Sequence, residues 1–69
     1  MYQQMIMKIL GCTAADARLV EAFMRLESGT LNNLSPQKFK NEAEVCWICV
    51  KEDRAGAEEL GKSFGIQVR

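Results

Sequence analysis

Residues 34–50 read Leu-Ser-Pro-Gln-Lys-Phe-Lys-Asn-Glu-Ala-Glu-Val-Cys-Trp-Ile-Cys-Val, and this stretch decides the fold class. Ser35 is a favoured helix N-cap, and Pro36 follows at the first helical position, where its missing N–H costs nothing. The last six residues are apolar and rich in strand-favouring side chains, so a buried strand is the alternative interpretation. A helix is favoured because the start signal is strong and no Gly or later Pro interrupts the stretch. We therefore predict a helix over residues 35–51.

Two further helices are predicted, one on each side of this stretch. Thr13 is a candidate N-cap for a helix over residues 14–28, which ends before Gly29 because glycine readily adopts the left-handed conformation. Asp53 is a candidate N-cap for a helix over residues 53–64. Both segments repeat apolar residues at helical spacing, so the start signals and the periodicity agree.

The amino-terminal residues carry a weaker signal. Apolar side chains at positions 2, 5, 6, 9 and 10 fit a short helix better than a strand, and residues 1–12 form either this separate helix or an arm. We predict a single all-α domain over residues 1–69. It is a small, self-associating bundle of three short helices, or of four if the amino-terminal segment is counted. A chain of 69 residues has room for only a thin core.

The two longer helices carry more apolar side chains than one face of each helix needs. The predicted core positions are Leu19, Phe23, Leu26, Phe39, Ala43, Cys46 and Val50. The surplus apolar positions are Ala17, Val20, Met24, Val45 and Ile48. Three short helices cannot enclose both sides of two of them, so we expect surplus residues to bind a second copy or a target protein. With Trp47 at the margin of the core, the predicted contact residues are Val20, Met24, Val45, Trp47 and Ile48.

The charge pattern argues against nucleic acid and membranes as partners. Lys and Arg total 9 and Asp and Glu total 9, and the signs are balanced along the chain. Nucleic-acid-binding proteins usually carry a basic stripe, and helices that lie on membranes carry a cationic face. No apolar run approaches the ~18 residues that a membrane-spanning helix needs.

The cysteines suggest a metal or redox site, which other features of the sequence disfavour. Cys46 and Cys49 form a CxxC motif, but they lie late in the predicted helix among apolar neighbours that raise a thiol pKa. A structural zinc site needs four ligands, and the chain has 3 cysteines and no histidine. We expect no metal and no cofactor, with Cys46 buried and Cys49 near the edge of the core. The odd number of cysteines and the lack of an export signal indicate the cytoplasm.

Residues 56–63, Gly-Ala-Glu-Glu-Leu-Gly-Lys-Ser, match the spacing of a phosphate-binding P-loop. That loop requires a strand before it, free backbone N–H groups and a helix after it. Here Glu58 and Glu59 occupy the place of the phosphate charge, and too few residues follow Ser63 for the helix. We predict that this match has no function.

The remaining evidence favours binding over catalysis. Histidine, the commonest general base, is absent, and no carboxylate pair is placed by spacing into an apolar pocket, so we do not expect an enzyme. We predict a small helical protein–protein interaction module that regulates or inhibits a larger protein. One alternative is a helical DNA-binding or transcription-regulating protein that uses the polar start of the helix over residues 35–51. Another is a metal or redox protein that uses the CxxC motif.

Overall fold

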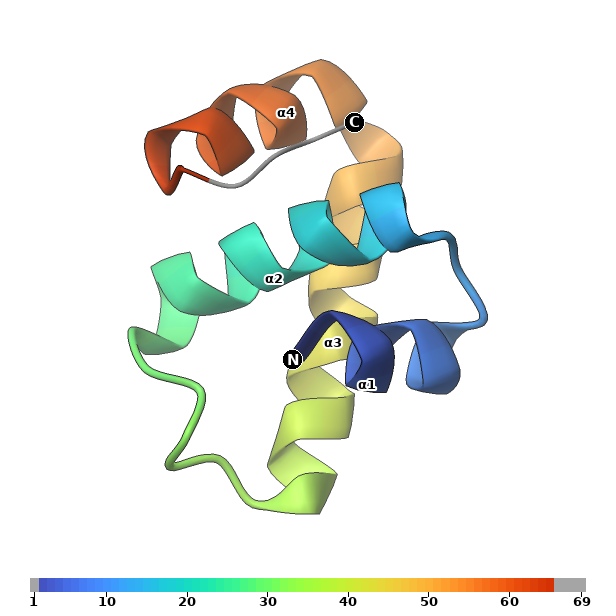
Figure 1. The fold of residues 1–69 in the computed structure, drawn as a ribbon, viewed down its shortest axis with the longest axis vertical. Helices are drawn as coiled ribbons and strands as arrows, with labels where there is room; N and C mark the ends of the chain where they lie inside the picture. Colours follow the sequence, from blue (N-terminus) through green and yellow to red (C-terminus); the bar gives the residue numbers. More distant parts are fainter. Residues whose placement is uncertain (1, 66–69) are drawn as a thin grey trace.

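The computed structural model describes residues 2–65, which form four helices and contain no strand. The helices are α1 (Tyr2–Leu10), α2 (Ala14–Ser28), α3 (Pro36–Glu52) and α4 (Arg54–Ser63). In Figure 1, α2 lies between α1 and α4, and α3 runs behind α1 and α2 and contacts α4, which begins at its end. The predicted all-α fold is confirmed, and the apolar end of α3 is helical rather than a strand.

Each predicted N-cap is formed by the side chain that the sequence indicated. The Thr13 hydroxyl accepts from the Asp16 N–H at 3.2 Å, and the Ser35 hydroxyl accepts from the Lys38 N–H at 3.2 Å. A cap of this kind satisfies an N–H that has no partner inside the helix, and it stabilises the helix by about 1 kcal/mol. The local signals therefore place the starts of α2 and α3 to within one residue.

Asp53 joins α3 directly to α4. Its backbone N–H donates to the Cys49 carbonyl at 3.1 Å and ends α3, while its side chain accepts from the Gly56 N–H at 3.0 Å and begins α4. A Cβ atom at Gly56 would overlap the Asp53 carboxylate, so a larger residue here would require the capping side chain to shift. One residue thus serves as the end of one helix and the start of the next.

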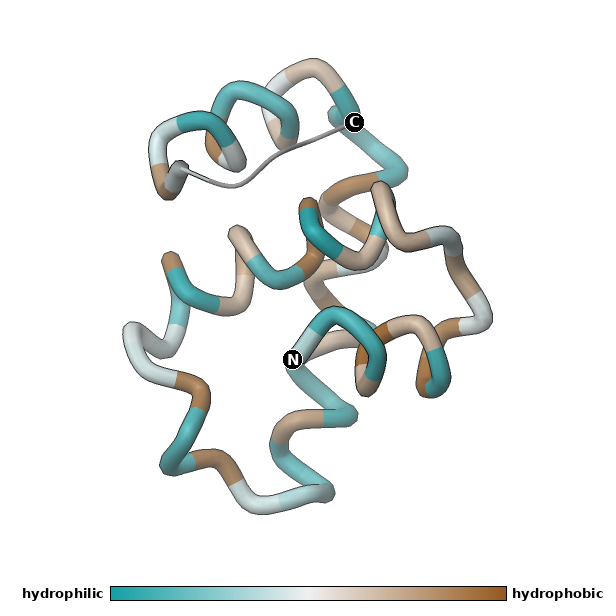
Figure 2. Tube along the Cα trace, in the orientation of Figure 1, coloured by the Kyte–Doolittle hydropathy of each residue, from teal (hydrophilic) through white to brown (hydrophobic). Residues whose placement is uncertain are grey.

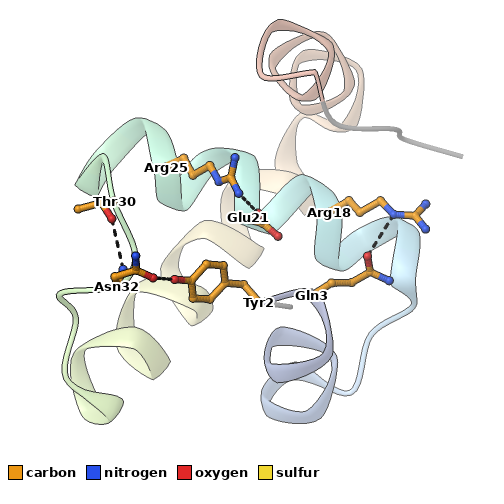
Figure 3. Close-up of polar contacts among 7 residues, drawn as sticks. All are labelled: Tyr2, Gln3, Arg18, Glu21, Arg25, Thr30 and Asn32. Atoms are coloured by element: carbon orange, nitrogen blue, oxygen red, sulfur yellow. Dashed lines mark hydrogen bonds and ion pairs between the residues drawn. The ribbon is translucent and has the colours of Figure 1, made fainter.

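Polar contacts fasten the amino-terminal helix α1 to the rest of the bundle (Figure 3). The Tyr2 hydroxyl donates to Asn32 in the loop before α3, and the Gln3 side-chain oxygen accepts from Arg18 Nε of α2 at 3.3 Å. The Tyr2 ring also stacks on Phe39 of α3, with 5.9 Å between ring centroids. Residues 2–10 are therefore a packed fourth helix rather than a free arm.

The opposite side of α2 holds α4 through an ion pair. Arg54, the first residue of α4, lies 2.6 Å from a carboxylate oxygen of Asp16 that is itself buried. Within the described residues α1 and α4 do not contact each other, so α2 separates them. The alternation of hydrophobic and hydrophilic residues along the helices is visible in Figure 2.

The core corrects two expectations about α2. Ala17, Val20 and Met24 are 0% exposed, so the prediction that they are left uncovered by the fold is wrong. Leu26, expected in the core, is 57% exposed. Helix α2 is packed against α1, α3 and α4, so more of its surface is covered than a bundle of three helices would allow. The buried hydrophobic residues of the described chain are Ile6, Ala17, Leu19, Val20, Ala22, Met24, Leu31, Phe39, Ala43, Cys46, Val50 and Ala57.

Candidate protein-contact face

Helix α3 buries one side and exposes the other. Its buried residues, Phe39, Ala43, Cys46 and Val50, fall within about 60° of one another at 100° per residue. Val45 and Ile48 lie on the side of the helix away from this group and are 59% and 52% exposed. Because they are three positions apart, their side chains are neighbours on the helix surface.

We call the surface around these two residues the outer face of α3. It consists of Asn41, Glu44, Val45, Ile48, Lys51 and Glu52, all of them exposed. The Asn41 side-chain oxygen accepts from the Gln37 amide at 3.1 Å. Glu44 and Glu52 have no ion-pair partner within residues 2–65. The face is thus a small apolar centre surrounded by polar side chains, and the charged ones among them form no ion pair within residues 2–65.

Trp47 lies beside the outer face rather than on it. It follows Val45 by two positions, which places the two side chains about 160° apart around the helix. The indole is half-buried and packs against the core, and Lys51 Nζ lies 5.3 Å from its ring centroid. An exposed cation–π contact of this kind contributes about 0.5–1 kcal/mol. Trp47 therefore supports the position of Lys51 at the edge of the face.

The structure brings together only part of the predicted contact set. Val45 and Ile48 share an exposed surface, whereas Val20 and Met24 belong to the core. Three large apolar side chains outside the predicted contact set are also exposed in the described chain: Met5, Leu26 and Phe64. Met5 lies on α1, Leu26 lies on α2 at a position with the helical spacing of a core residue, and Phe64 directly follows α4. Isolated exposed apolar residues are common on protein surfaces, so they do not define a second site.

The CxxC cysteines lie on α3, one on each side of the core boundary. Cys46 is buried and Cys49 is half-buried, as predicted, and both are free thiols. Burial raises the pKa of the Cys46 thiol from 9.0 to about 12, and the nearby Glu42 adds to the effect. A thiol with a raised pKa is a poor nucleophile and a poor metal ligand at neutral pH. Among the described residues, no group of Cys, Asp and Glu side chains is arranged to hold a metal ion.

The stretch that matches a P-loop is helical. Its residues, 56–63, lie on α4, where the backbone N–H groups of a helix are already engaged in hydrogen bonds. Lys62 pairs with Glu59 at 3.4 Å, and the Ser63 hydroxyl donates to the Glu59 carbonyl at 3.2 Å. The segment therefore lacks the open loop that would surround a phosphate.

Comparison with known proteins identifies no relative of this chain. No family model, no curated protein and no solved structure matches the chain. Within residues 2–65, none of the helices has the length and apolar character needed to cross a bilayer. The candidate site stands on the geometry of the outer face of α3 alone.

Proposed function

We propose that this chain is a small helical interaction module that binds another protein through the outer face of α3, and that it regulates or inhibits that partner. The observation that supports this is the exposure of Val45 and Ile48, 59% and 52%, side by side on a helix whose opposite side is core. Covering a Val or Ile completely is favourable by about 1.5–3 kcal/mol, so a partner that seals both side chains gains affinity.

The face suits recognition of a helix by an apolar groove or by a second helix. Anchors at i and i+3 are the usual pattern of such contacts. Helix α3 is already formed and held by its buried side, so binding does not require the helix to fold first, and the entropic cost is small. The free thiols Cys12, Cys46 and Cys49 fit a reducing compartment, and we place the interaction in the cytoplasm.

A photo-crosslinking amino acid at position 48 tests the binding site. We expect a defined covalent adduct with a protein in host cells, and we expect Val45→Asp to abolish it because the apolar centre is lost. The matched control places the same crosslinker at Gln4, which is exposed on α1 and distant in sequence from α3. Equal capture from positions 4 and 48, or capture that persists with Val45→Asp, would contradict the proposal.

The regulatory role is tested on the captured protein itself. Its activity is measured with the wild-type chain, with Ile48→Asp and without any addition. A change in activity that requires Ile48 supports regulation, and the direction of the change distinguishes inhibition from activation. Binding without any effect on activity would leave an interaction module and exclude a regulator of that protein.

A further inference from the structure

We propose that a second copy of this chain covers the outer face of α3, with the two α3 helices antiparallel across a twofold axis. This rests on the proposed function, because the second copy covers the same face when no other partner occupies it. The order of charges along the face favours this arrangement, because Glu44 lies near one end and Lys51 near the other. Seven positions separate them, so they fall within about 20° of one another around the helix and share one flank of the apolar centre.

The antiparallel arrangement matches both the apolar and the charged residues. When Val45 of one copy is level with Ile48 of the second copy, Glu44 lies two residues, or about 3 Å along the axis, from Lys51 of the second copy. In a twofold antiparallel pair each flank faces the same flank of the partner. Glu44 therefore meets Lys51 of the second copy, and the symmetry repeats the pair on the other side of the axis.

The ends of the face are also complementary. In this register Asn41 is level with Glu52 of the second copy. Because the Asn41 oxygen already accepts from Gln37 at 3.1 Å, its amide N–H groups remain to donate to that carboxylate. A parallel pair would instead place Glu52 against Glu52 of the second copy and leave Glu44 without a lysine. The charges thus select the antiparallel orientation.

The size of the face predicts a weak, reversible dimer. Each copy contributes two large exposed apolar side chains from one face of a single helix, residues 41–52, whereas stable interfaces bury about 1,200–2,000 Å² with about 20–30 residues a side. Charge complementarity in such a contact mainly fixes orientation and specificity. The register is therefore the part of the proposal that experiments can test most sharply.

Sedimentation equilibrium with charge-reversed variants tests this register. The wild type is expected to dimerise as its concentration rises. Glu44→Lys alone and Lys51→Glu alone each create two like-charge contacts, and we expect each to weaken the dimer about tenfold. An equimolar mixture of the two variants restores both attractive pairs and should form a heterodimer about as tightly as the wild type. Circular dichroism confirms that each variant remains helical.

Lys51→Glu also removes the contact between Lys51 and Trp47. A second variant tests the register while leaving that contact intact. Asn41→Lys places a cation level with Glu52 of the second copy and should tighten the dimer, whereas a parallel pair would be weakened by the two new lysines. Any of three results would overturn the proposal. The wild-type chain could stay monomeric at its highest attainable concentration, the mixture could fail to associate, or the Asn41→Lys dimer could be weaker than the wild type. Capture of a different protein by the crosslinker at position 48 would still support the proposed function in those cases.

Discussion

Helices α2 and α3 both carry apolar side chains on more than one side, yet the additional ones are buried in α2 and exposed in α3. In α2 the additional residues Val20 and Met24 are 0% exposed, while in α3 the additional residues Val45 and Ile48 remain more than half exposed. Helix α2 lies between α1 and α4 with α3 across its back, so its sides are covered. Helix α3 packs against the other three helices with one side only. Position in the bundle, rather than composition of the helix, decides which apolar surface is available for a partner.

The largest expected effect contrasts a charge placed in each helix. Met24→Asp buries an unpaired carboxylate in the core and should destabilise the fold by at least about 3 kcal/mol, a large part of the stability of a domain this small. Ile48→Asp, on the outer face of α3, should change the stability of the monomer by no more than about 0.5 kcal/mol. Urea unfolding followed by circular dichroism at low protein concentration measures both. Similar losses for the two variants would mean that α3 has no free side.

Truncation of a valine in each helix gives a smaller contrast. Val20→Ala removes two methyl groups from the core and should cost about 2 kcal/mol. Val45→Ala removes the same groups from an exposed position and should cost less than about 0.5 kcal/mol. The chemistry is identical, so the difference between the two unfolding free energies reports burial alone. A difference near zero would contradict the assignment of Val20 to the core.

Alkaline pH should reveal the buried side of α3 through Cys46. Burial raises the pKa of this thiol from 9.0 to about 12, while in the unfolded chain it returns to its ordinary value. The folded state then keeps a proton that the unfolded state releases, so stability is fully present below about pH 9 and falls as the pH rises towards 12. Urea unfolding at neutral and alkaline pH should show a smaller fall for Cys46→Ala than for the wild type. An equal fall in both proteins would show that Cys46 is accessible to water.

The smallest expected effect tests the exposed end of α2. Leu26 has the helical spacing of a core residue but is 57% exposed. Leu26→Ser should therefore change the unfolding free energy by no more than about 0.5 kcal/mol, within the range of ordinary surface substitutions. The same urea measurement applies. A loss of 2 kcal/mol or more, typical of a buried leucine, would place Leu26 in the core after all.

Local chemistry made most of the fold predictable. Thr13, Ser35 and Asp53 each cap a helix because their side-chain oxygens reach an N–H that the helix itself cannot satisfy, and this depends only on neighbouring residues. The assignment of Cys46 to the core and of Ile48 to the surface followed from the helical period in the same way. The helix starts and the placement of Cys46 and Ile48 were therefore confirmed.

The predictions that failed depended on how helices meet. Whether Met24 or Leu26 is buried is decided by the helices packed around α2, which contact it from other parts of the sequence. The segment over residues 2–10 had a weak signal, and counting it as optional removed one of the three helices that contact α2. Of the predicted contact residues, Val20 and Met24 on α2 are therefore buried, whereas Val45 and Ile48 on α3 are exposed as expected.

The junction at Asp53 has a consequence for how this sequence tolerates insertions and deletions. Because one residue both ends α3 and begins α4, no slack exists between the two helices. One extra residue inside the first turn of α4 would rotate the rest of that helix by about 100° and turn the buried Ala57 away from the core. The connection over residues 29–34, by contrast, contains exposed positions that can absorb a change in length. Variation in length among functional versions of this chain is therefore expected between α2 and α3 and excluded between α3 and α4.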